Sequence, residues 1–428
     1  MDGTTVRVGL LGCGNVGGAL AQLILNDATE IQARTGLALE LARIAVHSTA
    51  RERPAPIPAG LLTHDAAAVV NDGSIDVVIE LIGGVEPARS LILQALKSGK
   101  PVVTANKELL ANCGAELIEA AATSGVDLLF EAAVGGGIPL IRPLRESLAG
   151  ERIRRVMGIV NGTTNYILTR MTEAGASYHD ALAEAQQLGY AERDPTADVE
   201  GFDAAAKAAI LASVAFGVRV VAGDVYREGI SAVTAADIGY ARRLGYVVKL
   251  LAIVERSAGE VAVRVHPAMI PTDHPLASVR ESFNAVFVEG DAVGELMLYG
   301  RGAGGMPTAS AVLGDLLDAA HNLRTGGAGR ALTLEATAIR PIDDLESQYY
   351  LNLEVVDRPG VLAGVAGVFG EHRVSIKSME QEGLGEEARL VFITHSARER
   401  DVQACLRDLH HLDSVDRIGG LLRVIGPE

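Results

Sequence analysis

The chain has few cysteines and no long uncharged apolar run. Its 428 residues contain three cysteines, without the paired spacing of a zinc site or a disulfide framework. We expect these thiols to be small buried side chains in a reducing compartment. No uncharged apolar run approaches the roughly 18 residues of a membrane span, and no basic-then-apolar leader opens the sequence. We therefore expect a cytoplasmic protein with no membrane partner.

Basic residues are outnumbered by acidic ones. The 38 Lys+Arg against 54 Asp+Glu give a net charge of −16, which repels phosphate backbones and argues against a nucleic-acid partner. The ten histidines show no H-x-x-x-H or His/Cys spacing, and no G-x-S-x-G motif is present. These absences argue against a zinc enzyme and against a serine hydrolase.

The order of strand and helix signals predicts the fold class. A chain of this length exceeds what one core usually supports, so we expect two or three domains. Up to about residue 137, short apolar strands alternate with alanine-rich helical stretches, as in "VRVGLL", "SIDVVIELIGG" and "KPVVTANK". This alternation predicts an α/β domain, a doubly wound parallel sheet of the Rossmann type.

The remaining domains follow from changes in this pattern. Residues 138–300 read as an α+β substrate and dimerisation domain, and we expect 301–340 to pack back on the first domain, 1–137. A linker, 341–348, leads to 349–428, whose order of strand, helix, strand, strand, helix, strand indicates a ferredoxin-like βαββαβ module. We expect this module to be dispensable for chemistry.

A glycine-rich turn follows the first strand. Gly12, Gly14 and Gly17 form G-x-G-x-x-G between a strand and a helix, the context in which this motif binds a dinucleotide pyrophosphate. The alternative is a glycine-rich turn in a cofactor-free domain. The second strand ends in "AVHSTARER", without the acidic residue that binds the ribose of NAD, and Ser48 and Arg51 there favour NADP slightly. Solvated loop charges are the alternative for the arginine.

Two later strands end in polar side chains. Thr104, Asn106 and Lys107 follow a buried strand and open a helix, at the edge where open α/β sheets bind ligands. A lysine that extends to solvent is the plain alternative. Glu131 precedes three glycines in "EAAVGGGIP", so its carboxylate and nearby carbonyls could bind a hard cation. An interdomain hinge explains this segment equally well.

The stretch "GYAERDPTADVEGFDAAAKAAILASVAFGV" places five carboxylates in twelve positions, followed by one lysine in an apolar helix. From Ala204 to Val218, Lys207 is the only charge, so the helix reads as mostly buried. Asp203 and Lys207 are four residues apart and share one face of the helix. An ordinary helix ion pair is the alternative to a catalytic one.

Several motifs together carry a family resemblance. "GCGNVG", "TANK", "EAAVGGGIP", "NGTTNYIL", "LGYAERDPTADVEGFDAAAK" and "GAGGMPTASAV" resemble homoserine dehydrogenase, in this order, across nearly the first 340 residues. The tail "NLEVVDRPGVLAGVAGVFGEHRVSI" resembles an ACT domain, an amino-acid-binding regulatory module. The resemblance implies an NAD(P)-dependent interconversion of L-aspartate 4-semialdehyde and L-homoserine. Nothing in the chain resembles a fused aspartate kinase, so we expect a monofunctional enzyme.

The resemblance also implies roles for single residues. Lys107 and Lys207 match the family's catalytic lysines. Its substrate-binding residues correspond to Glu192, Asp198, Asp203 and Lys107. A sodium site corresponds to Glu131 with the carbonyls of Val134, Gly136 and Ile138. With the glycine turn, the expected cofactor-binding residues are Gly12, Gly14, Asn15, Val16, Gly17, Ser48, Arg51, Thr104, Lys107 and Gly305.

The resemblance further implies a regulated oligomer. We expect L-threonine as an effector of the ACT module, and a homodimer or homotetramer; a purely structural pairing role for the module is the alternative. Two other functions stay open: a different NAD(P)-dependent oxidoreductase acting on an amino-acid semialdehyde or hydroxy acid, and an inactive sensor of amino acids.

Overall fold

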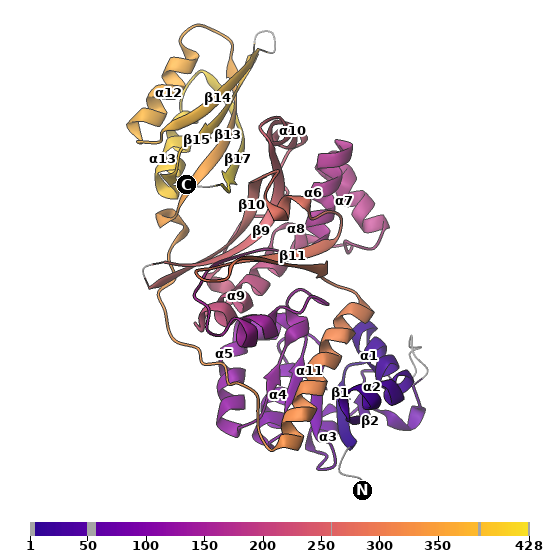
Figure 1. Ribbon diagram of the computed structural model, residues 1–428. Coiled ribbons are helices and arrows are strands. Elements are labelled where there is room, and N and C mark those ends of the chain that lie inside the picture. Colours follow the sequence, from indigo (N-terminus) through magenta and orange to yellow (C-terminus); the bar gives the residue numbers. More distant parts are fainter. Residues whose placement is uncertain (1–4, 49–56, 258, 384–386, 427–428) are drawn as a thin grey trace.

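The structure is a computed structural model of the whole chain. It describes residues 5–48, 57–257, 259–383 and 387–426. Figure 1 shows the N-terminal sheet with its helices at one end, the C-terminal module at the other, and the remaining strands between them. None of the described helices is long and apolar enough to cross a lipid bilayer.

The N-terminal sheet is parallel and doubly wound, as the sequence predicts. Its strand order is β3-β2-β1-β4-β5-β6, so the direction of winding reverses between β1 and β4. The strands are β1 Thr5–Leu11, β2 Ala38–Ala45, β3 Leu62–Thr63, β4 Val77–Glu80, β5 Val102–Thr104 and β6 Leu128–Leu129. The helices beside it are α1 Asn15–Asn26, α2 Ala28–Thr35, α3 Ala66–Asn71, α4 Ala88–Lys97 and α5 Lys107–Ser124.

A helix from late in the chain completes this part. Helix α11, Gly305–Thr325, lies along α1, and its Val312 and Leu316 share a buried core with Val8 and Leu10 of β1 (Figure 1). Burial of these side chains, roughly 1.5–3 kcal/mol each, holds the returning segment in place. Two segments far apart in the sequence therefore build the N-terminal part of the molecule.

The second sheet has eleven strands and runs through the rest of the molecule. Its main order is β12-β11-β7-β9-β10-β17-β13-β15-β14, with β8 beside β10 and β16 beside β13. The strands are β7 Ile153–Ile159, β8 Tyr226–Arg227, β9 Tyr246–Ser257, β10 Glu260–Pro271, β11 Phe283–Gly290, β12 Gly294–Arg301, β13 Glu346–Val356, β14 Ile376–Gly383, β15 Glu387–Thr394, β16 Ala397–Arg398 and β17 Val415–Val424. Helices α6 Gly162–Ala174, α7 Tyr178–Gln187, α8 Thr196–Val199, α9 Phe202–Phe216, α10 Ala235–Arg243, α12 Val361–Glu371 and α13 Glu399–Leu409 accompany it.

The C-terminal module has the expected βαββαβ order, but it is joined to the middle strands more closely than a linker alone would do. Strand β17 pairs in parallel with β10, Arg423 opposite Ala268 and Val424 opposite Met269, so one sheet crosses the junction. Strand β13 begins at Glu346, inside the stretch expected as a linker. Two strands far apart in the sequence thus pair where no local pattern indicates a contact.

The segment after α11 is extended and pinned to the middle of the molecule. Glu335 and Val218 form an isolated parallel bridge, and Ile339 does the same with Val261. In Figure 1 this segment runs as a long strap from the end of α11 to the C-terminal module. Its backbone hydrogen bonds to Gly217 and Arg219, just after α9, and to Val261 of β10 hold it at these two points.

Candidate active site

Two helices bring a carboxylate and two lysines together. Helix α9 carries Asp203 in its first turn and Lys207 one turn later, and the Lys207 ammonium donates to Asp203 Oδ2 at 2.7 Å and to the Val160 carbonyl at 2.6 Å. Lys107, the first residue of α5, contacts Asp203 Oδ1 with its own ammonium. The carboxylate therefore holds one lysine from each of the two main parts of the molecule.

Alanine and glycine explain how α9 can place this pair in the interior. Alanine, the strongest helix former, lets the helix pack closely, and Gly201 (φ 79°) and Gly217 (φ 65°) adopt the left-handed conformation at its two ends. Asp203 and Lys207 are both buried. The helix of the sequence prediction is thus buried along almost its whole length.

Burial and charge act against each other at Asp203. Loss of water favours the neutral acid, but the ammonium groups of Lys207 and Lys107 outweigh this effect and hold the pKa of Asp203 well below its ordinary value. For Lys107, burial lowers the pKa and the Asp203 charge more than compensates, so its pKa is raised. The cluster is therefore one carboxylate shared by two lysine side chains.

An asparagine that the sequence reading did not single out completes the cluster. The Asn161 amide donates to Asp198 Oδ1 at 2.7 Å and to Asp203 Oδ2 at 2.9 Å, so it ties α8 to α9. Its carbonyl accepts from Thr164 N and caps α6. A signal was present in "NGTTNYIL", where an asparagine directly follows a strand and precedes a helix, but an asparagine in that position is also typical of a plain helix cap.

Glu192 lies apart from this cluster. It is exposed in the turn between α7 and α8, where its backbone carbonyl accepts from the Gln186 amide. Among the described residues its carboxylate makes no hydrogen bond or ion pair with the Asp203 cluster. The structure therefore brings together four of the predicted catalytic and substrate-binding residues, Lys107, Asp198, Asp203 and Lys207, and leaves Glu192 at the rim.

The glycine turn has the geometry that close backbone approach requires. A Cβ at Gly12 (φ 94°) would meet the Leu81 carbonyl at 2.5 Å, and one at Gly17 would meet the Gly12 carbonyl at 2.2 Å. At Gly14 a Cβ would meet nothing within 4 Å. Gly12 and Gly17 are thus needed by the fold, whereas Gly14 leaves open space at the start of α1.

That open space is part of a large cavity at the reversal point of the first sheet. The cavity measures about 870 Å³. Its lining includes the expected residues Gly12, Gly14, Asn15 and Ser48, with His47, Leu81 and Ile82. Val16 packs against the neighbouring core, and a Cβ at Gly305 would lie 3.1 Å from the Asn15 carbonyl, so the start of α11 borders the turn. Arg51 lies outside the described residues.

Thr104 has a different place from the one expected. Its side chain is fully buried, and its hydroxyl donates to Glu80 Oε2 at 2.7 Å. Glu80, also fully buried, accepts from Ile82 N and Gly83 N through its other oxygen. The pair thus stabilises the turn after β4 through hydrogen bonds to its backbone. Thr104 itself does not line the cavity. Glu80 was missed because a buried acid in an apolar strand has no characteristic sequence pattern.

Glu131 acts as a hydrogen-bond acceptor for backbone. Its two carboxylate oxygens accept from the N–H groups of Leu140, Ile141 and Arg142. Three donors satisfy this buried acid without a cation. No group of three or more His, Cys, Asp or Glu side chains with metal-binding geometry occurs in the described ranges.

Comparisons with known proteins agree with this geometry. The family described as homoserine dehydrogenase matches residues 139–317, its NAD-binding domain matches 12–131, and an ACT domain matches 349–413. Homoserine dehydrogenases of Mycobacterium tuberculosis and Corynebacterium glutamicum are each 50% identical over 99% of this chain, and the matches cover 99% and 96% of those proteins.

Solved structures give the same result. The homoserine dehydrogenase of Thiobacillus denitrificans is 42% identical, with a TM-score of 0.92 and 98% of each chain covered. A hyperthermophilic archaeal homoserine dehydrogenase in complex with NADPH is 30% identical, with a TM-score of 0.62, over 74% of this chain and 97% of that one. The similarity to the Thiobacillus denitrificans structure and to the two bacterial relatives extends over the glycine turn, both lysine-bearing helices and the C-terminal module. The chain belongs to the homoserine dehydrogenase family of oxidoreductases.

Proposed function

We propose that the Asp203 cluster is where this chain interconverts L-aspartate 4-semialdehyde and L-homoserine. The observation that carries the proposal is one buried carboxylate shared by Lys107 and Lys207. Lys107 follows β5, whose neighbour β4 leads into Leu81 and Ile82 of the cavity lining. A bound nicotinamide cofactor supplies hydride to the aldehyde carbon. The aldehyde oxygen then needs a proton, which a side chain of this chain must donate.

Lys207 is the proton donor in this proposal, and Lys107 is a second donor to the same oxygen. Two of the three N–H bonds of Lys207 point to Asp203 and Val160, which fixes the ammonium and leaves its third N–H for substrate. The Lys207 side chain is 10% exposed and that of Lys107 is 47% exposed, so the more buried ammonium is the better shielded acid. Asp203 orients both and takes no proton itself.

Asp198 and Glu192 are proposed to hold the substrate ammonium. Asn161 fixes one oxygen of Asp198 beside Asp203, and the other is available for a charge-assisted hydrogen bond. Glu192, at the exposed rim, would complete this pair when substrate is bound. An ammonium between these groups would place the aldehyde end of a four-carbon substrate toward the lysines.

The cofactor is proposed to lie in the cavity along the glycine turn, with NADPH slightly favoured over NADH. Support comes from the missing acid at the end of β2, from Ser48 in the lining, and from the archaeal relative that was solved with NADPH. Gly14 leaves room for a pyrophosphate and the N-terminus of α1 faces it. We propose no step for a sodium ion, because Glu131 is already satisfied by backbone donors.

The C-terminal module is proposed to bind L-threonine. A cavity of about 430 Å³ there is lined by the turn 357–362 between β13 and α12, where backbone groups at Gly360 (φ 91°) can meet an amino acid. We also propose the division of the chain into three domains: 1–137 together with 301–340, then 138–300, and then 349–428 after the linker 341–348. Its junctions fall where the chain passes between the two sheets.

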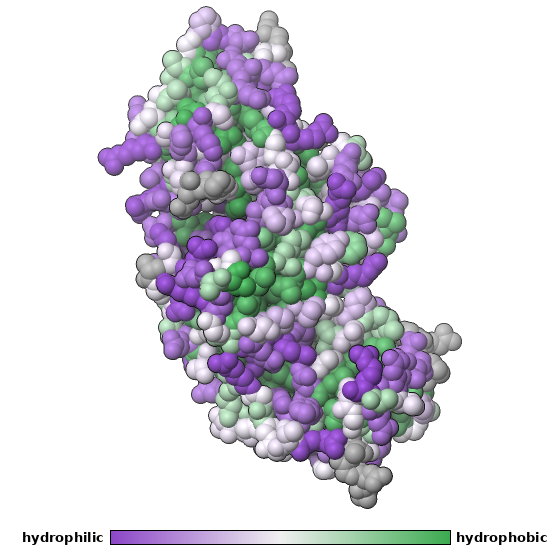
Figure 2. All heavy atoms as spheres, viewed as in Figure 1, coloured by the Kyte–Doolittle hydropathy of each residue, from purple (hydrophilic) through white to green (hydrophobic). Residues whose placement is uncertain are grey.

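The chain is also proposed to form a homodimer or homotetramer. Of the two outer strands of the long sheet, β14 is exposed along nearly its whole length and β12 has no buried residue, and exposed strand edges favour pairing. Figure 2 shows hydrophobic side chains gathered across the middle of the visible face, over the region where Figure 1 draws β11. Multi-angle light scattering of the purified chain tests this, and a monomeric mass would contradict it.

The activity is tested by cofactor oxidation. The purified chain is mixed with NADPH or NADH, aspartate semialdehyde is added, and the loss of absorbance is followed while the product is identified by mass spectrometry. We expect homoserine, faster turnover with NADPH, and a response to L-threonine. No oxidation of either cofactor by folded protein would contradict the proposed reaction, whereas equal rates would contradict only the cofactor preference.

A further inference from the structure

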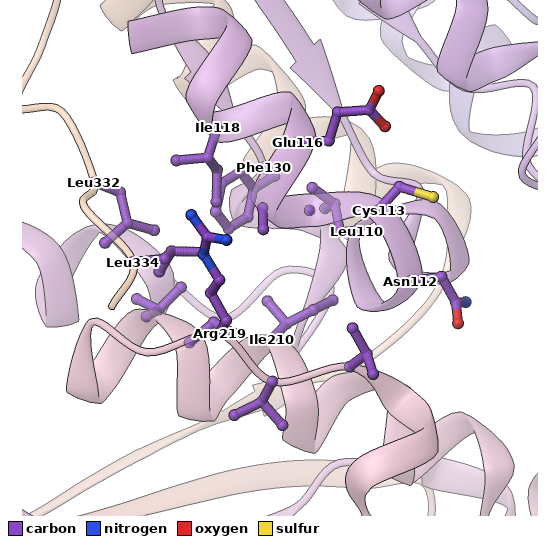
Figure 3. A pocket seen from close by; sticks show the side chains of 16 residues that line it. Leu110, Asn112, Cys113, Glu116, Ile118, Phe130, Ile210, Arg219, Leu332 and Leu334 are labelled. Atoms are coloured by element: carbon purple, nitrogen blue, oxygen red, sulfur yellow. The ribbon is translucent and has the colours of Figure 1, made fainter. Parts of the chain in front are cut away.

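A second cavity, separate from the cofactor cavity, lies between the two helices that carry the catalytic lysines. It measures about 270 Å³, just below the usual range of small-molecule sites, about 300–1,000 Å³. Its walls are α5, α9 and the extended segment that follows α11, and most of the lining is apolar. Figure 3 shows Leu110, Ile118, Phe130, Ile210, Leu332 and Leu334 around it.

One cation reaches into this apolar space. Figure 3 draws the Arg219 side chain directed between Leu332, Leu334 and Phe130. The Arg219 backbone is fixed, because its N–H donates to the Glu335 carbonyl at 2.8 Å. Its guanidinium makes no ion pair or hydrogen bond with any residue in the described part of the chain. Five N–H donors of a fixed fork are therefore left for a planar anion.

The acidic residue nearest this cavity does not neutralise the arginine. Glu116 belongs to the lining, but its two oxygens accept from Arg89 at 2.6 and 2.7 Å, and Figure 3 draws its carboxylate pointing away. Among the described lining residues, the charge left without a partner is thus positive.

We propose that this cavity binds a small apolar monocarboxylate, with its carboxylate on Arg219 and its hydrocarbon body between α5 and α9, and that its binding alters catalysis. Bidentate pairing with a guanidinium supplies orientation, and the apolar walls supply the burial. A free amino acid fits less well, because its ammonium would find no free carboxylate in the described lining. The site is therefore distinct in chemistry from the threonine site proposed above.

The position of the cavity gives a physical route to the catalytic cluster. Leu110 follows Lys107 by three residues on α5, and Ile210 follows Lys207 by three on α9, so each lies about 4.5 Å along its helix from a catalytic lysine. A ligand that sets the spacing of these helices changes the contact between Lys107 and Asp203. This effect on turnover rests on the proposed function, whereas binding at Arg219 does not.

Isothermal titration calorimetry tests the binding. The probe is 3-phenylpropanoate at millimolar concentration, and 3-phenylpropan-1-ol is the uncharged match. The variant Arg219→Gln removes the charge from an exposed position, and Arg242→Gln, an exposed arginine at the end of α10, is the matched control. Ser213→Leu fills the cavity from α9, and hexanoate is titrated as a second carboxylate.

We expect saturable binding of one 3-phenylpropanoate per chain, about tenfold weaker in Arg219→Gln and unchanged in Arg242→Gln. Ser213→Leu should abolish it, and the alcohol should bind equally weakly to the wild-type chain and to Arg219→Gln. Turnover should change with the probe without competition against the semialdehyde. No saturable binding of either carboxylate, or equal affinity in Arg219→Gln, would overturn the site; unchanged turnover with intact binding would overturn only its coupling to catalysis.

Discussion

The Asp203 carboxylate is shared by two lysines, so the lysines should not act independently. We expect Lys107→Ala to lower kcat by roughly tenfold or more, because it removes a donor from the aldehyde oxygen. In the double variant with Lys207→Ala the loss should fall short of the product of the two single losses, since both groups serve one oxygen. Steady-state kinetics of the three variants measure this. Losses that multiply would show that the lysines act at different steps.

Gly14 offers a test of cofactor placement that leaves the fold intact. A side chain there meets no protein atom within 4 Å, so Gly14→Val should fold and fill the space needed by the pyrophosphate. We expect the Kd of NADPH, measured by fluorescence titration, to rise about tenfold or more while the melting temperature stays close to that of the wild type. Gly14→Ala is the smaller control. Unchanged affinity in folded Gly14→Val would place the cofactor elsewhere.

Because of Lys249, the free energy of unfolding should change with pH in the alkaline range. The Lys249 ammonium is buried in β9, donates to Asn165 Oδ1 and the Val279 carbonyl, and forms no ion pair with a carboxylate in the described ranges. The charge of Glu173 acts on it more weakly than burial does. Burial lowers the pKa of Lys249 to about 8 from its ordinary 10.5. Between these values the unfolded chain binds the proton and the native chain does not, so the free energy of unfolding rises with pH across this window.

The variant Lys249→Met removes this dependence. We expect its free energy of unfolding, relative to the wild type, to fall by at most about 3 kcal/mol as pH rises from 8 to 10.5. Urea unfolding of both proteins at several pH values measures the difference. Lys97→Met, at an exposed lysine of α4, is the control and should show no such trend. A constant difference across the window would show that Lys249 keeps its ordinary affinity for protons.

Strand β17 carries one buried arginine, paired with two glutamates, and one exposed arginine, and their ion pairs should differ in energy. Arg423 is 1% exposed and binds Glu399 of α13 and Glu228 of the middle region, all at 2.8–2.9 Å. Arg417, on the same strand, is 61% exposed and binds Glu354. Removing Arg423 leaves the fully buried Glu399 with an uncompensated charge.

We therefore expect Arg423→Met to cost about 3–5 kcal/mol in the free energy of unfolding, and Arg417→Met at most about 1 kcal/mol. Urea unfolding monitored by circular dichroism measures both. Similar losses from the two variants would mean that the Arg423 network does not hold the module to the middle strands. The comparison is matched, because both positions lie on one strand and both lose the same side chain.

Local patterns predicted individual elements better than the contacts between them. The spacing of Asp203 and Lys207 predicted their ion pair, because four residues make one turn of a helix, and the G-x-G-x-x-G turn predicted the start of α1. The contact between Lys107 and Asp203 depends on how α5 packs on α9, and no local sequence pattern predicts that packing. Asn161 and Glu80 were missed because residues of these types also occur without a functional role, an asparagine as a helix cap and a buried glutamate as a hydrogen-bond acceptor for backbone.

The junction between the module and the rest of the chain is the largest difference from the sequence prediction. A dispensable module implies that a chain ending at Arg340 keeps its turnover. Such a chain would lack the contact between Arg423 and Glu228 and the hydrogen bond from the Tyr350 hydroxyl to Asp237. Both contacts are partly or fully buried. Glu228 is followed closely by Ile230, whose N–H donates to Val199 of α8, the helix of Asp198. The module is thus structurally coupled to the substrate side of the site.

In the proposed reaction, the N-terminal sheet region binds the cofactor and the middle region, through α9, supplies the proton. Single-turnover oxidation of NADPH by saturating aspartate semialdehyde, compared between the wild type and Lys207→Ala, tests this most directly. We predict a rate at least about 100-fold lower in the variant, with its circular dichroism spectrum and NADPH affinity nearly unchanged. A rate close to that of the wild type in folded Lys207→Ala would contradict the account and leave Lys107 as the acid.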